Sequence, residues 1–489
     1  MSLFERFASC VYRAPPRAGS TLTIPTFVVL ALFFIVNART HAAIFNLDSN
    51  LDAVDAAPGD GLCATASKTC TLRAAIQEAN ASPGFDEIRL RPDKYSLKLR
   101  GGVVDDTAAS GDLDIREPLW IRRDPQFPPG AIAVEISDLG FLLHAPDGER
   151  VFDINTGNSS VPVHFENVLI EFGTAHDALG GGAVLVRAGS SVLFESSVLY
   201  ANGADARGNA MAVYGSAEMR ESRVFDNHRS WNSRPGEGGG AFYVADGASL
   251  HLSDTVVESN THCSGGAILA HGASVVTIVR SNIGENTTAN IPGCAAAQQV
   301  GGELALDGAV TMRISDSTLR SVEQLLEARG GAQIDFNHVT VAPDSTWSEV
   351  RLHDVSSKLR IGNSVWAKNA AESTCNAPAG SVISLGGNVF MDSPLCNAAL
   401  ARNDVTVSTL ALAALFIDLP GDTIRMFTRT VFAPQRGSAA IDNGLTTLCS
   451  AADAAGTARP IAGSFLTPAR CDSGAIEWPP TSMLLNGFE

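Results

Sequence analysis

Three aspartates and one arginine in the middle of the chain are the residues that could support catalysis. Asp226 follows Phe225, whereas Asp254 and Asp316 each stand directly before a Thr or Ser. Two carboxylates that converge on one surface can cleave a glycosidic bond as acid and base, or as acid and nucleophile. Arg280 stands before Ser281 in the corresponding place, and would suit an elimination that needs carboxylate-bound Ca²⁺ and a basic side chain.

The residue directly before the Ser or Thr of each repeat differs in charge from one repeat to the next, which favours a structural interpretation. Glu221 precedes Ser222, Arg280 precedes Ser281 and Asp316 precedes Ser317. Charged residues at strand ends commonly stay solvated and discourage edge-to-edge aggregation. The sequence also contains no phosphate-binding loop and no nucleophile elbow. Whether the protein is an enzyme therefore stays open, and the balance is against a catalytic site.

Aromatic side chains gather in one stretch of the repetitive region. Tyr200, Tyr214, Trp231 and Tyr243 lie within 44 residues of a chain that is only 7% aromatic. Tyr and Trp are frequent at binding surfaces because each has an apolar ring and a polar end. We therefore predict an interaction face within residues 200–243, for an extracellular glycan or a component of a host or cell surface.

No metal centre or other cofactor is expected, with one alternative. Asp48, Asp52, Asp55 and Asp60 stand close together near the N-terminus and could hold Ca²⁺. Their spacing is not that of a calcium-binding loop, so a solvated acidic loop is the competing interpretation.

The charge and the N-terminus indicate an exported protein. The net charge is −17, and residues 1–42 carry four arginines against Glu5, a net of +3, which leaves −20 for the remainder. A surface this acidic repels nucleic acid and anionic lipid. It also disfavours a polyanionic polysaccharide, unless a bound cation bridges the two.

Basic residues before an apolar run from Leu22 to Val36 predict a signal peptide over residues 1–42. No membrane span is expected after its removal, although an uncleaved anchor is the alternative.

Eight of the nine cysteines form pairs that are close in sequence. We predict disulfides between neighbours, although eight cysteines allow 105 connectivities. A metal site would need shorter spacings or clustered histidines. Disulfides imply the periplasm or the exterior. The pairs are Cys63 with Cys70, Cys263 with Cys294, Cys375 with Cys396, and Cys449 with Cys471.

A degenerate repeat runs from about residue 161 to residue 370. A small polar residue is followed two positions later by an apolar residue and often five positions later by Asn. Glycine-rich turns separate the copies, and the spacing between copies varies, as insertions into the loops of a solenoid permit. A right-handed parallel β-helix fits this pattern best. Its internal Asn ladder is predicted to contain Asn202, Asn227, Asn260 and Asn286.

A short helix precedes the repeats. Leu72, Ala75, Ile76 and Ala79 form one apolar stripe, and Thr71 is a suitable N-cap. Because so short a helix is marginal in isolation, it needs an apolar surface to pack on. We predict that Leu72 and Ile76 cover the open end of the first coil.

The residues around this helix resemble a known bacterial domain. The order Asp60-Gly61, Cys63 and Cys70 to Ile76 resembles the CSLREA domain, which typically begins exported parallel β-helix proteins. The family has Ser and Glu where this chain has Thr71 and Ala74, so the contact made by that Glu is in doubt here. Arg459-Pro460 and Cys471 to Glu477 resemble the end region termed choice-of-anchor type Q.

These expectations define an organisation and two candidate functions. Residues 43–100 would form the N-terminal cap, residues 101–400 the β-helix repeats, and residues 401–489 further coils and the end region. The protein would be secreted or on the cell surface of a Gram-negative bacterium, in the periplasm or outside the outer membrane. It would serve surface display, adhesion or carbohydrate binding. The alternative is a polysaccharide lyase or glycoside hydrolase of the pectate-lyase-like class.

Overall fold

The computed structural model describes most of the chain beyond the predicted signal peptide. That prediction, Cys10 and Trp231 lie outside the described residues. The described ranges are 42–101, 106–127, 134–138, 149–228, 238–288, 294, 301–342, 349–367, 375–418, 428–462 and 468–478.

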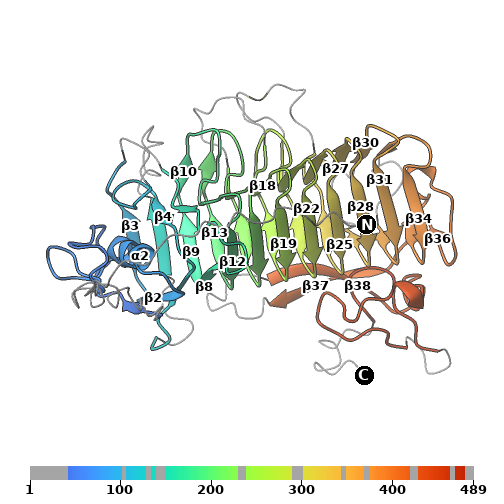
Figure 1. The fold of residues 1–489 in the computed structure, drawn as a ribbon. Helices are drawn as coiled ribbons and strands as arrows, with labels where there is room; N and C mark the ends of the chain where they lie inside the picture. Colours follow the sequence, from blue (N-terminus) through green and yellow to red (C-terminus); the bar gives the residue numbers. More distant parts are fainter. Residues whose placement is uncertain are drawn as a thin grey trace, which may run out of the picture. The chain divides into compact units, whose positions relative to one another are not determined.

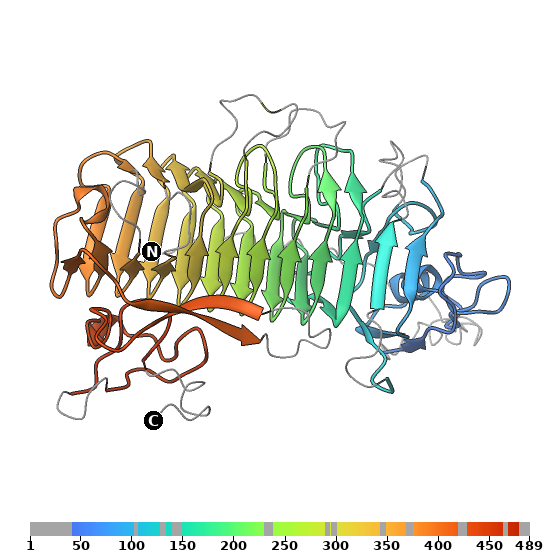
Figure 2. The ribbon, with the colours of Figure 1, turned by 180° about the vertical axis from the view of Figure 1, so that it is seen from behind.

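The repeats fold into three parallel sheets, here named sheets A, B and C, and successive coils contribute a strand to each (Figures 1 and 2). The chain is a right-handed parallel β-helix, as predicted. Sheet A contains β1 (Ile44–Asn46), β2 (Asp86–Leu90), β5 (Leu119–Arg123), β8 (Val163–Glu166), β12 (Ser191–Glu195), β16 (Ser216–Arg220), β19 (Ser249–Ser253), β22 (Val275–Val279), β25 (Thr311–Ser315), β28 (Gln333–Asn337), β31 (Lys358–Gly362) and β34 (Val382–Gly386).

Sheet B follows sheet A in each coil, and sheet C completes the coil. Sheet B contains β3 (Lys94–Leu97), β6 (Val134–Asp138), β9 (Val168–Glu171), β13 (Val198–Tyr200), β17 (Arg223–Phe225), β20 (Val256–Glu258), β23 (Asn282–Gly284), β26 (Thr318–Arg320), β29 (Thr340–Val341), β32 (Val365–Trp366), β35 (Val389–Met391) and β36 (Val405–Val407). Sheet C contains β4 (Leu113–Ile115), β7 (Phe152–Ile154), β11 (Val184–Val186), β15 (Met211–Val213), β18 (Phe242–Val244), β21 (Ile268–His271), β24 (Leu304–Asp307), β27 (Gln324–Arg329), β30 (Glu349–Leu352) and β33 (Cys375–Asn376). A short parallel pair, β10 (Thr174–Ala175) and β14 (Gly203–Ala204), lies between turns.

The interior of the coils is apolar because alternate residues of each strand point inward. Phe165 and Phe194 are fully buried on neighbouring strands of sheet A, with ring centroids 4.7 Å apart. Stacking like residues on successive coils gives the repeat its continuous core.

The four predicted asparagines form a buried ladder. Oδ1 of Asn260 accepts hydrogen bonds from N and Nδ2 of Asn227, at 3.1 and 2.9 Å. Asn202 donates to Asn227 in the same way, and Asn260 donates to Asn286. The ladder ends at Glu303, a fully buried carboxyl that accepts from Nδ2 of Asn286 at 2.7 Å. The predicted register is therefore confirmed.

The ladder leads to a prediction for Asn260→Ala. The substitution removes the acceptor of Asn227 and the donor to Val224 O, which stay buried, and the donor to Glu258 O, which is part-buried. Each unsatisfied buried group costs about 1–3 kcal/mol. We expect the variant to lose about 2–3 kcal/mol of unfolding free energy in urea titrations. Asn376→Ala, at an exposed position in β33, should change it by less than about 0.5 kcal/mol. Equal losses in the two variants would contradict a stabilising ladder.

A second ladder follows the corner between sheets A and B. The small polar residues that begin each repeat are buried there, and Ser281 Oγ accepts from Thr255 N at 3.0 Å. The residue before each of them turns the corner in the left-handed region, with φ of 50° at Asp254, 46° at Arg280 and 49° at Asp316. Three of the four residues proposed for catalysis, Asp254, Arg280 and Asp316, thus occupy the corner position of their coils.

The N-terminal helix α2 (Leu72–Ala81) packs against β2 and β4 of the first coil. Thr71 caps it by accepting from Ala74 N at 3.2 Å, and both Leu72 and Ile76 are buried. Arg73 is also buried, which the apolar stripe did not indicate. Its guanidinium pairs with Asp52 at 2.6 Å and donates to Gly111 O at 2.8 Å.

The C-terminal region differs from the expectation of further coils. Of its described residues, only β36 pairs with a coil strand. The chain then forms an antiparallel hairpin of β37 (Leu412–Asp418) and β38 (Thr428–Pro434), which lies alongside the coils (Figures 1 and 2). Two short 3₁₀ helices, η3 (Leu395–Asn397) and η4 (Thr446–Leu448), complete the elements. We refer to residues 408–478 as the C-terminal segment. Its described residues contact the A–B corner of the later coils at Asp254, Arg280 and Asp316.

Candidate functional site

The C-terminal segment covers two of the proposed catalytic carboxylates. Asp316 is 3% exposed, accepts from Ser450 Oγ at 2.6 Å and lies 3.6 Å from Arg459 Nε. Asp254 pairs with Arg280 at 2.6 Å and with Arg429 at 3.3 Å. Burial raises the pKa of Asp316 to about 6, and Arg459 opposes that shift. These contacts attach the C-terminal segment to the coils.

The remaining carboxylate lies elsewhere. Asp226 is exposed and follows β17, at the opposite end of the sheet B strand from the A–B corner. Asp254 and Asp316 are two coils apart, a distance of roughly 10 Å, with Arg280 on the coil between them. The structure therefore does not bring Asp226, Asp254 and Asp316 together.

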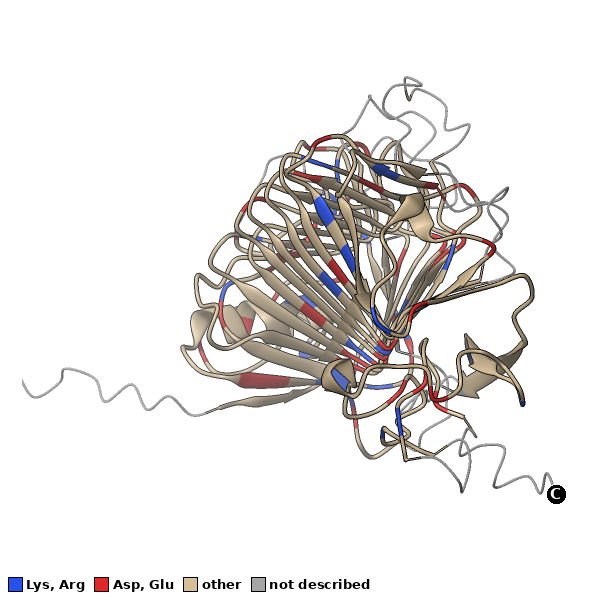
Figure 3. Ribbon diagram, turned by 90° about the vertical axis from the view of Figure 1, so that its right-hand side faces the viewer, with Lys and Arg blue, Asp and Glu red and all other residues tan. Residues whose placement is uncertain are grey.

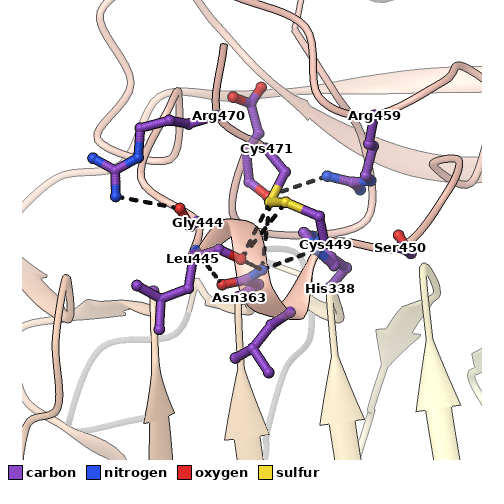
Figure 4. Close-up of a disulfide and its surroundings, with 12 residues drawn as sticks. His338, Asn363, Gly444, Leu445, Cys449, Ser450, Arg459, Arg470 and Cys471 are labelled. Carbon is purple, nitrogen blue, oxygen red and sulfur yellow. Dashed lines mark hydrogen bonds between the residues drawn. A yellow bond between two sulfur atoms is a disulfide. The ribbon is translucent and has the colours of Figure 1, made fainter. Parts of the chain in front are cut away.

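The disulfides follow the predicted pairing. All four bonds join the sequence neighbours. Cys449–Cys471 lies over the coils beside His338 and Asn363 (Figure 4). Asn363 donates to Leu445 O at 3.0 Å and accepts from Leu445 N at 2.7 Å. Burial, together with Arg459, lowers the pKa of His338 well below its usual range. Among the described residues, one group has the spacing of metal ligands, and it consists of His338, Cys449 and Cys471. The two sulfur atoms of this group are bonded to each other.

The acidic N-terminal loop is organised by hydrogen bonds to the backbone. Asp52 accepts from Lys98 N and Leu99 N at 2.6 and 2.7 Å, in addition to its pair with Arg73. Asp48 accepts from Cys70 N, Asp55 from Ala57 N and Ala64 N, and Asp60 from Leu62 N. The four carboxylates proposed for Ca²⁺ thus hold different parts of the loop.

The predicted aromatic face is divided between two sheets. Tyr243 lies in β18 of sheet C and Tyr214 directly follows β15 of the same sheet, with ring centroids 5.8 Å apart, and Tyr243 is 5% exposed. Arg207 donates to the Tyr214 hydroxyl at 3.0 Å and lies 4.9 Å from the Tyr243 ring. Tyr200 is on sheet B and cannot share a surface with them.

Tyr200 belongs to a partly exposed row on the outside of sheet B. The ring centroid of Tyr200 is 4.6 Å from that of Phe225 and 6.0 Å from that of Phe172. Arg223 lies 4.2 Å from the Phe225 ring and forms an ion pair with Glu258. Among the described residues, the hairpin contacts this sheet at β23 and β26, further along the stack.

Next to this row, Lys94 joins two glutamates from successive coils. Its Nζ forms ion pairs with Glu135 and, at 3.4 Å, with Glu171. The ammonium also lies 5.8 Å from the Phe172 ring. We name Lys94, Glu135, Glu171, Phe172, Tyr200, Arg223, Phe225 and Glu258 the sheet B surface. Lys94 and the two glutamates that it joins were not identified from the sequence, because variable loops hide which strands become neighbours.

The protonation of the two glutamates is linked, and their pKa values shift in opposite directions. Burial first, and then the contact with Glu135, raise the pKa of Glu171 to about 8. Burial alone would raise the pKa of Glu135, but its hydrogen bonds to Glu171 and Lys94 lower it. Two carboxyls in contact cannot both ionise easily. At neutral pH Glu171 is therefore the carboxylic acid that donates to the Glu135 carboxylate.

Comparison with known proteins adds one structural similarity. No protein-family model matches the chain, and neither does any curated protein. The crystal structure of pectate lyase Pel9A has a TM-score of 0.47 and 14% identity, over 90% of this chain and 98% of that chain. Within the described part of the chain, no helix has the length and apolar character needed to cross a membrane.

Proposed function

We propose that this protein is an exported, non-catalytic β-helical protein that binds glycans through the sheet B surface. The observation that carries the proposal is the partly exposed row of Phe172, Tyr200 and Phe225 beside a cluster of polar groups. Aromatic rings provide apolar contact area, and neighbouring carboxyl groups exchange hydrogen bonds with sugar hydroxyls. A display or adhesion role would follow from the same surface.

We also propose a location outside the cytoplasm, with the two end regions that the sequence resembles. Four disulfides are compatible with an oxidising compartment. The capped helix and the Cys63–Cys70 bond support a CSLREA-like unit at residues 43–100. Arg459 and Glu477 pair inside the C-terminal segment, which supports a structural role for the choice-of-anchor-like residues.

The alternative of a lyase or hydrolase has less support at this surface. Glycosidases hold their carboxyl groups about 5 Å apart for retention or about 6.5–9.5 Å apart for inversion. Glu135 and Glu171 instead both pair with Lys94, which ties up the carboxyl groups that a glycosidase would need as acid and nucleophile or base. Lys94 does not suit the role of an elimination base, because its carboxylate neighbours raise its pKa even though burial acts to lower it.

Affinity electrophoresis in gels that contain soluble polysaccharides tests the proposal. We expect at least one glycan to retard the native protein, and Tyr200→Ala to weaken that binding about tenfold, as loss of a buried aromatic contact does. Phe416→Ala is the matched control, because Phe416 is 67% exposed on the hairpin, and it should bind normally. Release of reducing ends or of unsaturated sugars would favour the enzyme instead. Equal binding by both variants would remove Tyr200 from the site.

A further inference from the structure

We propose that the glycan bound by the sheet B surface is uncharged, and that this surface discriminates against polyuronates and other anionic polysaccharides. The inference rests on the proposed function, because it specifies the ligand class of the same site. It follows from how the charges on this surface are paired.

The basic groups of the sheet B surface are both in ion pairs with its acidic groups. Lys94 contacts Glu135 and Glu171, and Arg223 contacts Glu258. The side chain of Arg223 is only 17% exposed and also lies over the Phe225 ring. An anionic sugar would have to separate one of these pairs, which would leave a carboxylate without its cation beside the bound anion.

The acidic groups also outnumber the basic ones. At neutral pH, with Glu171 protonated, the carboxylates of Glu135 and Glu258 balance Lys94 and Arg223, and the exposed Asp226 directly after Phe225 leaves the surface negative. On sheet A, acidic and basic residues likewise pair across neighbouring strands, as Asp335 of β28 and Arg360 of β31 do. Figure 3 shows acidic and basic positions side by side on neighbouring strands. With a chain charge of −17, the long-range field also repels a polyanion.

The glutamate pair provides groups that suit sugar hydroxyls. A carboxylic acid donates and accepts, while a carboxylate only accepts, so the glutamate pair offers both functions. Hydroxyl groups likewise donate and accept. The Tyr200 hydroxyl adds a further group of the same kind on the adjacent strand. The polar part of the surface therefore complements a neutral, hydroxyl-rich ligand.

The surface becomes more acidic as the pH rises. Glu171 on β9 faces Lys94 on β3, Glu135 on β6 and, at longer range, Tyr200 on β13. Because its pKa is raised to about 8, it loses its proton near that pH and the surface gains a negative charge. Discrimination against anionic glycans should therefore strengthen between pH 7 and pH 9.

The experiment compares neutral glucan, galactan and mannan with polygalacturonate and alginate in affinity gels, with and without Ca²⁺. We expect Tyr200-dependent retardation by at least one neutral glycan and at least tenfold weaker binding of both polyuronates. The double variant E135Q/E171Q leaves Lys94 without its carboxylate partners, so it should bind polygalacturonate at least threefold more tightly than the native protein. Glu349→Gln, which removes a partner of Arg351 on sheet C, is the control and should keep native selectivity.

The outcomes separate the two proposals. Tyr200-dependent binding of a polyuronate, with or without Ca²⁺, at the strength of a neutral glycan would overturn the charge inference and leave glycan binding intact. Retardation by none of the glycans would contradict glycan binding itself. If the double variant does not fold, as judged by far-UV circular dichroism, E171Q replaces it. In this isosteric variant, the discrimination against polyuronates should no longer change between pH 7 and pH 9; retention of that change would contradict the role of Glu171.

Discussion

Replacing Arg459 with Met is expected to release the C-terminal segment from the coils. The Arg459 side chain is fully buried, pairs with Glu477 at 2.8 Å and donates to Gly474 O at 2.8 Å. It also lies near Asp316 of the coil, so its loss leaves two buried carboxyls without a cation. Breaking such a buried pair costs about 3–5 kcal/mol.

The measurement is limited proteolysis combined with thermal unfolding. We expect Arg459→Met to become sensitive to cleavage within residues 408–478 while the β signal of the coils persists, since the coil ladders do not depend on Arg459. Parts produced by cleavage between Cys449 and Cys471 should stay joined under non-reducing conditions. Arg329→Met is the control, because its pair with Asp307 is 57% and 36% exposed. Such a pair contributes less than about 1 kcal/mol. Equal protease resistance of the two variants would show that Arg459 does not hold the segment.

Replacing both Leu72 and Ile76 with Asp is expected to expose the first coil. Both side chains are buried where α2 packs against β2 and β4. Two carboxylates against this apolar surface would cost several kcal/mol, so the helix should detach. The end of a stack of strands then presents unpaired backbone and apolar side chains, which favours aggregation.

Light scattering after size-exclusion chromatography, together with far-UV circular dichroism, measures this effect. We expect soluble aggregates with retained β signal in the double variant. The matched control replaces Leu51 and Leu62 with Asp, since these leucines of the same unit are 59% and 64% exposed. It should stay monomeric. A monomeric L72D/I76D protein with unchanged thermal stability would mean that the helix is an appendage and not a cap.

The sequence by itself determined the features that depend on local spacing. Asn227 and Asn260 repeat at the same distance from a small polar residue, so their place in the coil is set within each repeat. Thr71 caps its helix by a contact with Ala74, three residues away. The disulfides join cysteines that lie 7 to 31 residues apart in the sequence, and the folded coils and turns bring these neighbours together.

Only the tertiary structure decided which side chains share a surface. Lys94, Glu135 and Glu171 become neighbours because β3, β6 and β9 pair side by side in sheet B. Loops of different length separate these strands in the chain, so no regular spacing in the sequence indicates the pairing. Tyr200 and Tyr214 are close in sequence but lie on different sheets, since a coil turns sharply between them. Asp316 belongs to a repeat, yet its partner Arg459 comes from a segment that folds back over the coils. A periodic pattern fixes each coil, whereas contacts between distant segments depend on how the whole chain packs.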